Sequence, residues 1–161
     1  MLSLCLLAIS LPFVTQLEGG NAALKDLPGI AVLAEETSPD VQIYGVDAAW
    51  IDSIAARSLA KSGVALLTRS DASMSHRQPI LAIRLETVRI TNSHTFAWHL
   101  AVTAHQKTVT MAAPPDTVLN ATWAATGAIG VTSGAKLKAS VRETLESKLG
   151  EFAGAWKSQR H

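Results

Sequence analysis

The chain has 161 residues, of which 48% are hydrophobic and 17% are charged, and its formal net charge is +1. The length suits a single domain, and the composition supports a packed core and argues against a disordered chain. A net charge this close to zero gives no indication of nucleic-acid binding, which needs a clustered basic face. Because the one cysteine is Cys5, the predicted domain has no disulfide, thiolate metal site or cysteine nucleophile.

An apolar, uncharged run opens the sequence, from Met1 to Val14. It is too short to cross a bilayer, which takes about 20 apolar residues, but it has the length of a signal-peptide core. Small residues follow, and cleavage after Ala22 or Ala23 satisfies the small-residue rule of the cleavage site. We therefore predict a signal peptide at residues 1–23 and a periplasmic or secreted protein.

Two features of this opening segment differ from an ordinary export signal. No Lys or Arg precedes the apolar run, and Leu4 before Cys5 has the wrong size for a lipidation motif. The alternative interpretation of the segment is a buried N-terminal strand or helix. Residues 24–161 are expected to form one α+β domain, without a linker or an internal repeat.

The first part of this domain is predicted to contain strands and one helix. Apolar runs at 30–34 and 41–46 indicate two strands, or one interrupted strand, around a polar turn. Asp47 is a helix N-cap for a helix over 48–62, and Gly63 marks the end of that helix. The buried stripe of the helix is expected at Ile51, Ile54, Ala55, Ser58 and Leu59.

The middle of the domain is predicted to form strands around one polar loop. A short apolar run at 64–67 predicts an internal strand, and residues 69–78 are polar and loop-like. Residues 80–90 alternate, and a slip of the apolar phase near Thr87 predicts a bulge or twist. One side of this strand is expected to bear Leu81, Ile83 and Leu85, and the other side Arg84 and Glu86.

A hairpin turn at 91–93 leads into a long partner strand. One face of that strand is expected to comprise Phe96, Trp98, Leu100, Val102 and Ala104. The opposite face comprises Ala97, His99, Ala101, Thr103 and His105. After Gln106 the apolar phase is predicted to flip to Val109 and Met111.

The last part of the chain is predicted to be a strand followed by a long helix. Pro114 and Pro115 break the pairing, and residues 118–125 predict a strand centred on Trp123. Glycines at 127, 130 and 134 indicate a flexible approach to a helix that begins near Ser133. Its apolar stripe is the clearest periodic signal in the chain: Leu137, Val141, Leu145, Leu149, Phe152 and Trp156.

The predicted order is strand, helix, strand, long hairpin, strand and long helix, which is typical of the α+β class. We expect a mixed, mostly antiparallel sheet of four to five strands with two helices packed on one face. One β–helix–β crossover is expected, and it should be right-handed.

Three histidines lie close together in the sequence, namely His94, His99 and His105. His99 and His105 share a strand face but lie about 20 Å apart, so they cannot bind one metal ion together. His94 has the opposite parity and lies near the turn. We interpret the three as solvent-facing strand residues and predict neither a metal site nor a cofactor.

Acidic residues give little indication of catalysis. Asp47 is expected to cap a helix, and Asp52 to lie near the positive end of that helix. A triad around Asp71 and His76 has little support, because the chain contains no nucleophile elbow of the G-x-S-x-G type. No residue is therefore assigned a catalytic role.

The four tryptophans divide into core and surface candidates. Trp98 and Trp156 fall on predicted core faces, whereas Trp50 lies off the buried stripe and Trp123 suits either position. Exposed tryptophans are typical of binding surfaces. The predicted binding residues are therefore Trp50, Trp123, His99 and His105.

Several runs together resemble a group of exported bacterial α+β proteins that have no assigned activity. These runs are LPGIAV at 27–32, SLAKSGV at 58–64, QPILAI at 78–83, LAV at 100–102 running to Gln106, and Thr122-Trp123. The order of elements is also similar to the lipopolysaccharide-assembly lipoprotein and to the amino-terminal domain of the Tol-system translocation protein. The resemblance covers roughly residues 27–158 and implies a protein that acts by binding partners. The chain departs from the lipoprotein in lacking a lipidation motif.

We therefore hypothesise a non-enzymatic periplasmic binding or envelope-assembly module. It would contact an envelope protein or envelope component through a sheet edge or through the surface around Trp50 and Trp123. One alternative is a small hydrolytic or metal-dependent enzyme, which would use His76, Asp71, His94 or Glu36. The other alternative is a carrier of a small apolar ligand, with a cleft between the sheet and the last helix.

Overall fold

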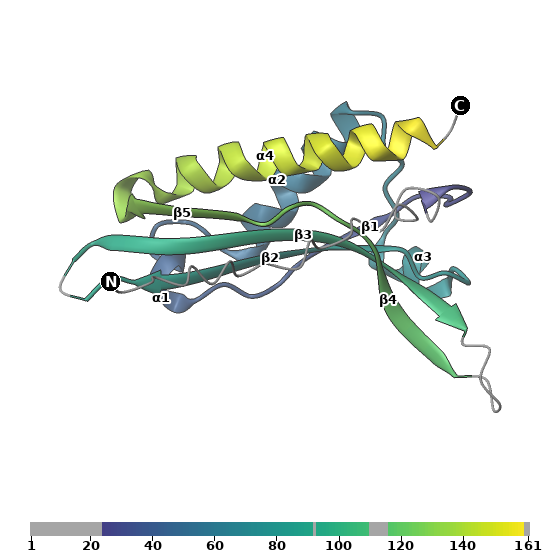
Figure 1. The fold of residues 1–161 in the computed structure, drawn as a ribbon, viewed down its shortest axis with the longest axis horizontal. Coiled ribbons are helices and arrows are strands. Elements are labelled where there is room, and N and C mark those ends of the chain that lie inside the picture. The colour runs from purple at the N-terminus through teal and green to yellow at the C-terminus, as the bar shows by residue number, and fades with distance from the viewer. Residues whose placement is uncertain (1–23, 92, 110–115, 160–161) are drawn as a thin grey trace, which may run out of the picture.

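The computed structural model describes residues 24–91, 93–109 and 116–159. Figure 1 shows one layer of strands with helices packed against it, which confirms the predicted α+β class. The segment at 1–23, predicted to be a signal peptide, lies outside the described residues. In chain order the elements are β1 (Ala31–Ala34), α1 (Pro39–Gln42), α2 (Ala48–Lys61), α3 (Arg69–Met74), β2 (Ile80–Arg89), β3 (Thr95–Val109), β4 (Thr117–Ala124), β5 (Ala128–Ser133) and α4 (Gly134–Ser158).

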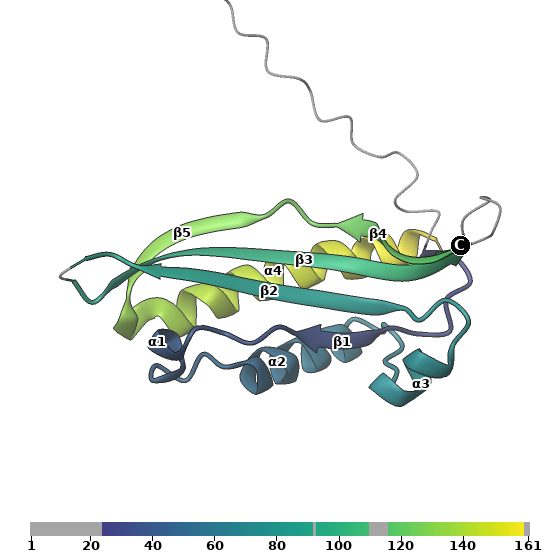
Figure 2. The same cartoon turned by 90° about the horizontal axis from the view of Figure 1, so that it is seen from below.

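The strands form one mixed sheet in the order β1-β2-β3-β4, and β5 also pairs with β3. β1 is parallel to β2, whereas the other pairs are antiparallel. β3 is long enough to pair with β5 through its first part and with β4 through its second part. In Figure 2, β4 and β5 follow one another along the same edge of the sheet. The sheet therefore has β1 at one edge and the β4–β5 pair at the other.

The two long helices cover one face of the sheet, as predicted. α4 lies along β3 and β5, and α2 packs beside α4 and against β1 (Figure 1). The predicted stripe of α4 is buried without exception: Leu137, Val141, Leu145, Leu149, Phe152 and Trp156. The predicted core faces of β2 and β3 are buried beneath it. Each large buried side chain stabilises the fold by about 1.5–3 kcal/mol, so α4 is an integral part of the core.

The boundaries of α2 follow the predicted signals. The Asp47 carboxylate accepts a hydrogen bond of 2.7 Å from the backbone N–H of Trp50 and caps the first turn. Gly63 takes a φ of +76° after the last turn, a conformation that favours glycine. In the expected buried stripe, Ser58 is half-buried and the other members are buried.

The prediction of a strand over 41–46 is wrong, because a short helix and a turn occupy this segment. Pro39 begins α1 with a φ suited to a first helical position, and Gly45 then takes a φ of +71°. The N–H of Val46 donates to the carbonyl of Val41 at 3.4 Å, and both valines are buried. The turn folds both apolar residues onto the core, which produces a spacing that resembles a strand.

The segments at 64–67 and 69–78 also differ from their predictions. Residues 64–67 contribute one isolated parallel bridge, between Ile30 and Leu66, instead of a strand. Part of the predicted loop forms α3, whose N-cap Thr68 accepts a hydrogen bond from the N–H of Asp71. A capping threonine with an acidic residue three positions later is a local signal for a helix start.

The two predicted changes of strand phase are absent at the expected places. Pairing between β2 and β3 passes Thr87 without a shift, and Val88 simply lies exposed on the opposite face from the core. Gln106 continues the core-facing alternation of β3 and is buried. Val109 is exposed, and Met111 lies outside the described residues.

The register shift occurs instead between β3 and β4. Ala104 pairs with Trp123, whereas the next residue, His105, pairs with Ala121, which leaves Thr122 as the additional residue in β4. The hydroxyl of Thr122 donates to the Ala104 carbonyl at 3.3 Å. This register shift lies near the end of β4, where the partner of β3 at this edge of the sheet changes from β4 to β5.

Residues 128–133 form the strand β5, so the prediction of a flexible approach to α4 is wrong. A Cβ atom at Gly130 would collide with the indole ring of Trp98, and one at Gly134 would collide with the ring of Tyr44. Aromatic rings that cover glycine in a strand compensate for its missing side chain. Gly130 in β5 and Gly134 at the start of α4 thus make room for aromatic rings.

Candidate binding surface

The two predicted tryptophans do not form one surface. Trp50 is half-buried on α2, with the ammonium nitrogen of Lys138 at 5.2 Å from the ring centroid. Trp123 is half-buried on the helix-facing side of β4 and meets Phe152 edge-on, with ring centroids 5.0 Å apart. Their contacts on α4, Lys138 and Phe152, are separated by about 21 Å of helix.

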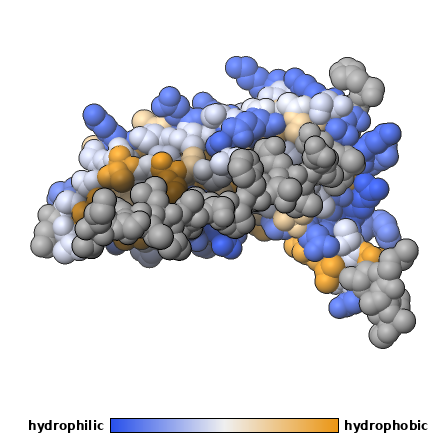
Figure 3. All heavy atoms as spheres, viewed as in Figure 1, coloured by the Kyte–Doolittle hydropathy of each residue, from blue (hydrophilic) through white to orange (hydrophobic). Residues whose placement is uncertain are grey.

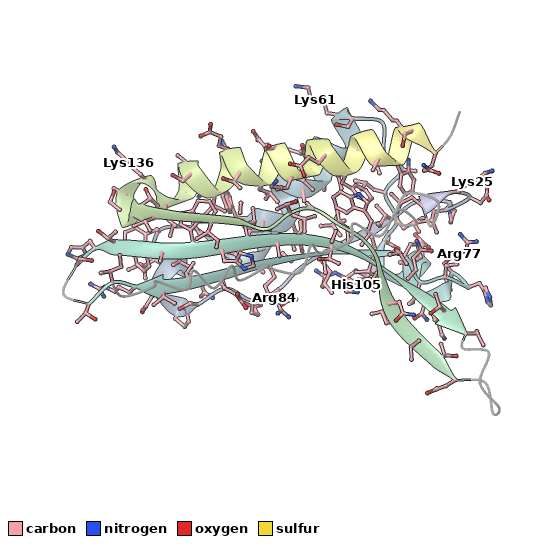
Figure 4. The ribbon with its side chains drawn as sticks, in the orientation of Figure 1. Lys25, Lys61, Arg77, Arg84, His105 and Lys136 are labelled. Carbon is pink, nitrogen blue, oxygen red and sulfur yellow. The ribbon has the colours of Figure 1, made fainter. Side chains whose placement is uncertain are left out.

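The two predicted histidines lie on the face of the sheet that α2 and α4 leave uncovered. We call this the open face. The Nδ1 atom of His99 lies 3.3 Å from a carboxylate oxygen of Glu86, and the backbone of His105 pairs with Ala121. Figure 4 shows His105 and Arg84 on the side of the sheet away from α4. The structure therefore places the histidines apart from both tryptophans and apart from one another.

The residues that a hydrolytic or metal-dependent enzyme would use have structural partners or lie apart. The Asp71 carboxylate accepts a hydrogen bond of 2.7 Å from the Thr68 hydroxyl and so belongs to the cap of α3. His76 borders a hollow of about 400 Å³ together with Arg77 and Lys107, and none of the described residues that line it is Asp or Glu. Within 24–91, 93–109 and 116–159, no group of three His, Cys, Asp or Glu side chains is arranged to hold a metal ion.

Apolar residues gather at one end of the open face. Val88, Ala97 and Val131 are direct neighbours across three strands, and Ile129 follows in the next row beside His99. The exposed fractions are 68% for Val88, 64% for Val131 and 81% for Ile129. Figure 3, which looks at the sheet edge-on, shows hydrophobic atoms at β5. Large aliphatic side chains this exposed and this close together are typical of interaction surfaces.

The backbone of β5 can be oriented from the hydrogen bonds around β3. The carbonyl of Thr95 accepts from the N–H of Ile90 in the β2 hairpin, so odd-numbered residues of β3 point toward β2. Even-numbered residues of β3 point the other way, as the bond from the N–H of Gly134 to the His94 carbonyl also indicates. Ile129 and Val131 pair with odd-numbered β3 residues, so their N–H and C=O groups point to the outer edge.

In the part of the chain that the structure describes, this outer edge lacks a covering strand, a charged residue and a proline. Among the described residues, no strand pairs with the outer side of β5. Its sequence, AIGVTS, contains no charged residue and no proline, which natural proteins use to block exposed edges. The free edge of β5 and the exposed side chains of Ile129, Val131 and Val88 together form what we call the β5 surface.

Charged residues border the β5 surface on the open face. Arg84 donates from Nε to a carboxylate oxygen of Glu35 at 2.8 Å, and its guanidinium lies 3.9 Å from Glu86. The hydrogen bond to Glu35 and the charge of Glu35 raise the pKa of Arg84 above its ordinary value, and Glu86 adds to this. The guanidinium therefore remains charged, and these residues form a polar border beside the apolar patch.

Sequence reasoning missed Ile129 and Val131 because glycine and small residues surround them. Alternation of Ile129 and Val131 about Gly130 was the one available signal for a strand.

The alternative of an apolar-ligand carrier placed a cleft between the sheet and the last helix. Phe152 and Trp156 of α4 are buried in this layer.

Comparison with protein-family models gives no match for this chain, and comparison with curated protein sequences gives no significant similarity. In the part of the chain that the structure describes, no helix combines the length and the apolar character needed to cross a bilayer. The resemblance to exported α+β proteins thus stays a prediction, and the functional argument depends on the surface itself.

Proposed function

We propose that this chain is a non-enzymatic binding module that accepts an extended segment of a partner protein at the free edge of β5. The observation that supports this is the outward orientation of the backbone groups of Ile129 and Val131 in an edge strand without charge or proline. Strand addition obtains affinity from backbone hydrogen bonds and specificity from alternate side chains. The exposed side chains of Ile129, Val131 and Val88 would supply the apolar contacts.

We also propose that the module works outside the cytoplasm, as a periplasmic or secreted envelope-assembly protein. The apolar run at Met1–Val14 and the small residues after it support an export signal. N-terminal sequencing of the protein from fractionated bacteria should find it in the periplasm or medium, beginning at Ala23 or Leu24. An uncleaved chain in the cytoplasmic fraction would contradict export and would leave the β5 proposal unaffected.

The strand-addition proposal can be tested with a proline at the edge. In Val131→Pro the substituted N–H is one that points outward, so no hydrogen bond to β3 is removed. We expect the variant to fold as the wild type does and to lose a partner that the wild-type protein recovers from envelope extract. Val131→Lys should weaken recovery as well, since lysine is a natural edge blocker.

Val88→Lys provides a matched control. Val88 lies in the same row of the open face and is exposed to a similar degree, but its backbone groups point toward β3. Because Val88 supplies an apolar contact but no outward backbone group, Val88→Lys should lose less of the recovery than Val131→Lys if backbone pairing at β5 is decisive. Recovery that is unchanged in Val131→Pro and Val131→Lys would contradict strand addition at this edge.

A further inference from the structure

A second hollow lies between α2 and α4, on the helical side of the molecule. Its volume is about 620 Å³, within the range of about 300–1,000 Å³ that is usual for small-molecule sites. Four cationic side chains line it: Arg57 and Lys61 from α2, and Arg142 and Lys157 from α4. Among the described residues that line it, Glu146 is the one that bears a carboxylate. We call this hollow the basic groove.

Helical periodicity explains why these charges meet. Arg142, Glu146 and Gly150 follow one another at steps of four along α4, one residue after the buried stripe of that helix. On α2, Arg57 and Lys61 are also four residues apart. Figure 4 shows Lys61 at the end of α2 beside α4, pointing away from the sheet. The two helices thus present basic stripes to a shared groove.

These positive charges are not balanced within the described residues. None of the four groove cations has a carboxylate oxygen within 4.0 Å there, whereas Arg69, Arg84 and Lys148 elsewhere on the surface do. Lys61 and Lys157 lie in the last turns of their helices, where the helix dipole favours a cation.

The two arginines have no such explanation. Arg57 and Arg142 lie in helix interiors, and the bond that Arg57 makes from Nε, 3.1 Å long, goes to the Ser53 carbonyl of its own helix. Guanidinium groups bind phosphate oxygens through paired N–H donors. Two such groups beside two ammonium groups give the groove a strong preference for an anion.

Gly150 also lines the basic groove. It lies inside the 25-residue helix α4, where glycine weakens the helix relative to alanine. A Cβ atom at this position would meet no other atom within 4 Å, so packing does not require the glycine. Its effect is to leave the backbone of α4 bare at the groove, which permits close approach of a bound group.

We propose that the basic groove binds a compact phosphorylated anion with at least two negative charges. Among the described residues, none of the strongly exposed aliphatic side chains lines the groove, and Ile54 in its lining is buried. The groove therefore recognises the phosphate groups and buries no acyl chain. A soluble phosphate ester and a phosphorylated lipid headgroup share this chemistry. The proposal is independent of strand addition at β5.

Calorimetric titration of the full domain with tripolyphosphate tests the site, with sulfate at equal ionic strength as the reference anion. Arg57→Gln combined with Arg142→Gln should weaken the binding at least tenfold. A control with Lys25→Gln and Lys136→Gln removes the same charge at exposed positions outside the groove and should stay within twofold of the wild type. Equal weakening in both double variants, or no tripolyphosphate binding beyond that of sulfate, would overturn the proposal.

Two glycine variants separate ligand contact from helix stability. Gly150→Ala and Gly154→Ala both fill open space in α4, so both should raise the melting temperature by about 1–3 °C. Gly150 lines the groove and Gly154 does not, so Gly150→Ala alone should weaken tripolyphosphate binding severalfold. Wild-type affinity in Gly150→Ala would contradict a ligand at the bare backbone.

Vesicles distinguish the two sources of phosphate. Sedimentation with phosphatidic acid–phosphatidylcholine vesicles, whose phosphomonoester headgroup can carry two negative charges, that is lost in the arginine double variant supports a lipid headgroup as the ligand. Binding of tripolyphosphate without vesicle binding supports a soluble phosphate ester. Vesicle binding that the double variant retains would overturn the groove as the lipid site. Val131→Pro should leave all of these results unchanged, which separates this proposal from the β5 surface.

Discussion

At the β1 edge of the sheet the outward backbone groups of Ile30 and the N–H of Ala34 have partners, whereas at the β5 edge those of Ile129 and Val131 have none among the described residues. Ile30, just before β1, donates to the Ala65 carbonyl and accepts from the N–H of Leu67, each at 3.0 Å. The N–H of Ala34 donates to the Asp52 carboxylate at 2.8 Å. β5 presents Ile129 and Val131 with no such partner in the described part of the chain.

The difference shows that this fold can close an edge without adding a strand. Asp52 lies on α2 and replaces a strand carbonyl by a side-chain oxygen, while its second oxygen accepts a hydrogen bond of 2.9 Å from Arg69. The segment 65–67 covers the beginning of the same edge with two backbone hydrogen bonds. Because the β1 edge is closed at Ile30 and Ala34 in this way, it is less open to pairing than the β5 edge.

The largest effect on stability is expected from Gly130→Ala, which disturbs the packing of β5 against β3. The new Cβ would collide with the Trp98 indole, and overpacking of this kind costs about 1–3 kcal/mol. We expect the free energy of unfolding in urea to fall by about 2–3 kcal/mol. Gly154→Ala, at an exposed helix position with open space, should instead raise it by about 0.5–1 kcal/mol. Similar stabilities of the two variants would contradict the role of Gly130.

A smaller effect is expected from opening the β1 edge with Asp52→Ala. The Ala34 N–H loses its acceptor, so the variant should be destabilised by about 1–2 kcal/mol and this amide should exchange faster with solvent. Asp52→Asn keeps an oxygen acceptor and should retain more of the protection. Unchanged exchange at Ala34 in Asp52→Ala would show that this carboxylate does not close the edge.

The smallest effect is expected from Glu35→Gln on the open face. The substitution removes the partner of Arg84 in an exposed ion pair, and such pairs contribute little to stability. The raised pKa of Arg84 in the folded state gives stability that is present at low and neutral pH and is lost only as pH rises through that raised value. Because the pair is exposed, the melting temperature should stay close to that of the wild type, and any small difference should be constant across the neutral range. A clear drop would show that the polar border stabilises the sheet.

The sequence predicted those elements whose periodicity is strong. The α4 stripe from Leu137 to Trp156 and the alternating core faces of β2 and β3 were predicted correctly, because each pattern continues over many residues. α1 and β5 were missed for local reasons. A four-residue helix that begins at Pro39 has no periodicity, and Gly130 interrupts the apolar alternation of β5.

The candidate sites were less predictable because they depend on tertiary structure. Asp52 was expected to lie near the positive end of a helix, yet its contact with Ala34 requires α2 to lie beside β1. The basic groove combines Arg57 and Arg142 from helices far apart in the sequence, so a nearly neutral net charge conceals it. An unpaired strand edge is likewise visible only after every strand has been assigned its neighbours.

Amide hydrogen exchange of the monomeric domain, resolved by residue with NMR, tests the free edge of β5 most directly. The amides of Gly130 and Thr132 point toward β3 and should be protected, whereas those of Ile129 and Val131 point outward and should exchange far faster. This alternation along one strand is the result that the account predicts. Equal protection of Ile129, Gly130, Val131 and Thr132 in the monomer would mean that the edge is already covered, and it would contradict the account.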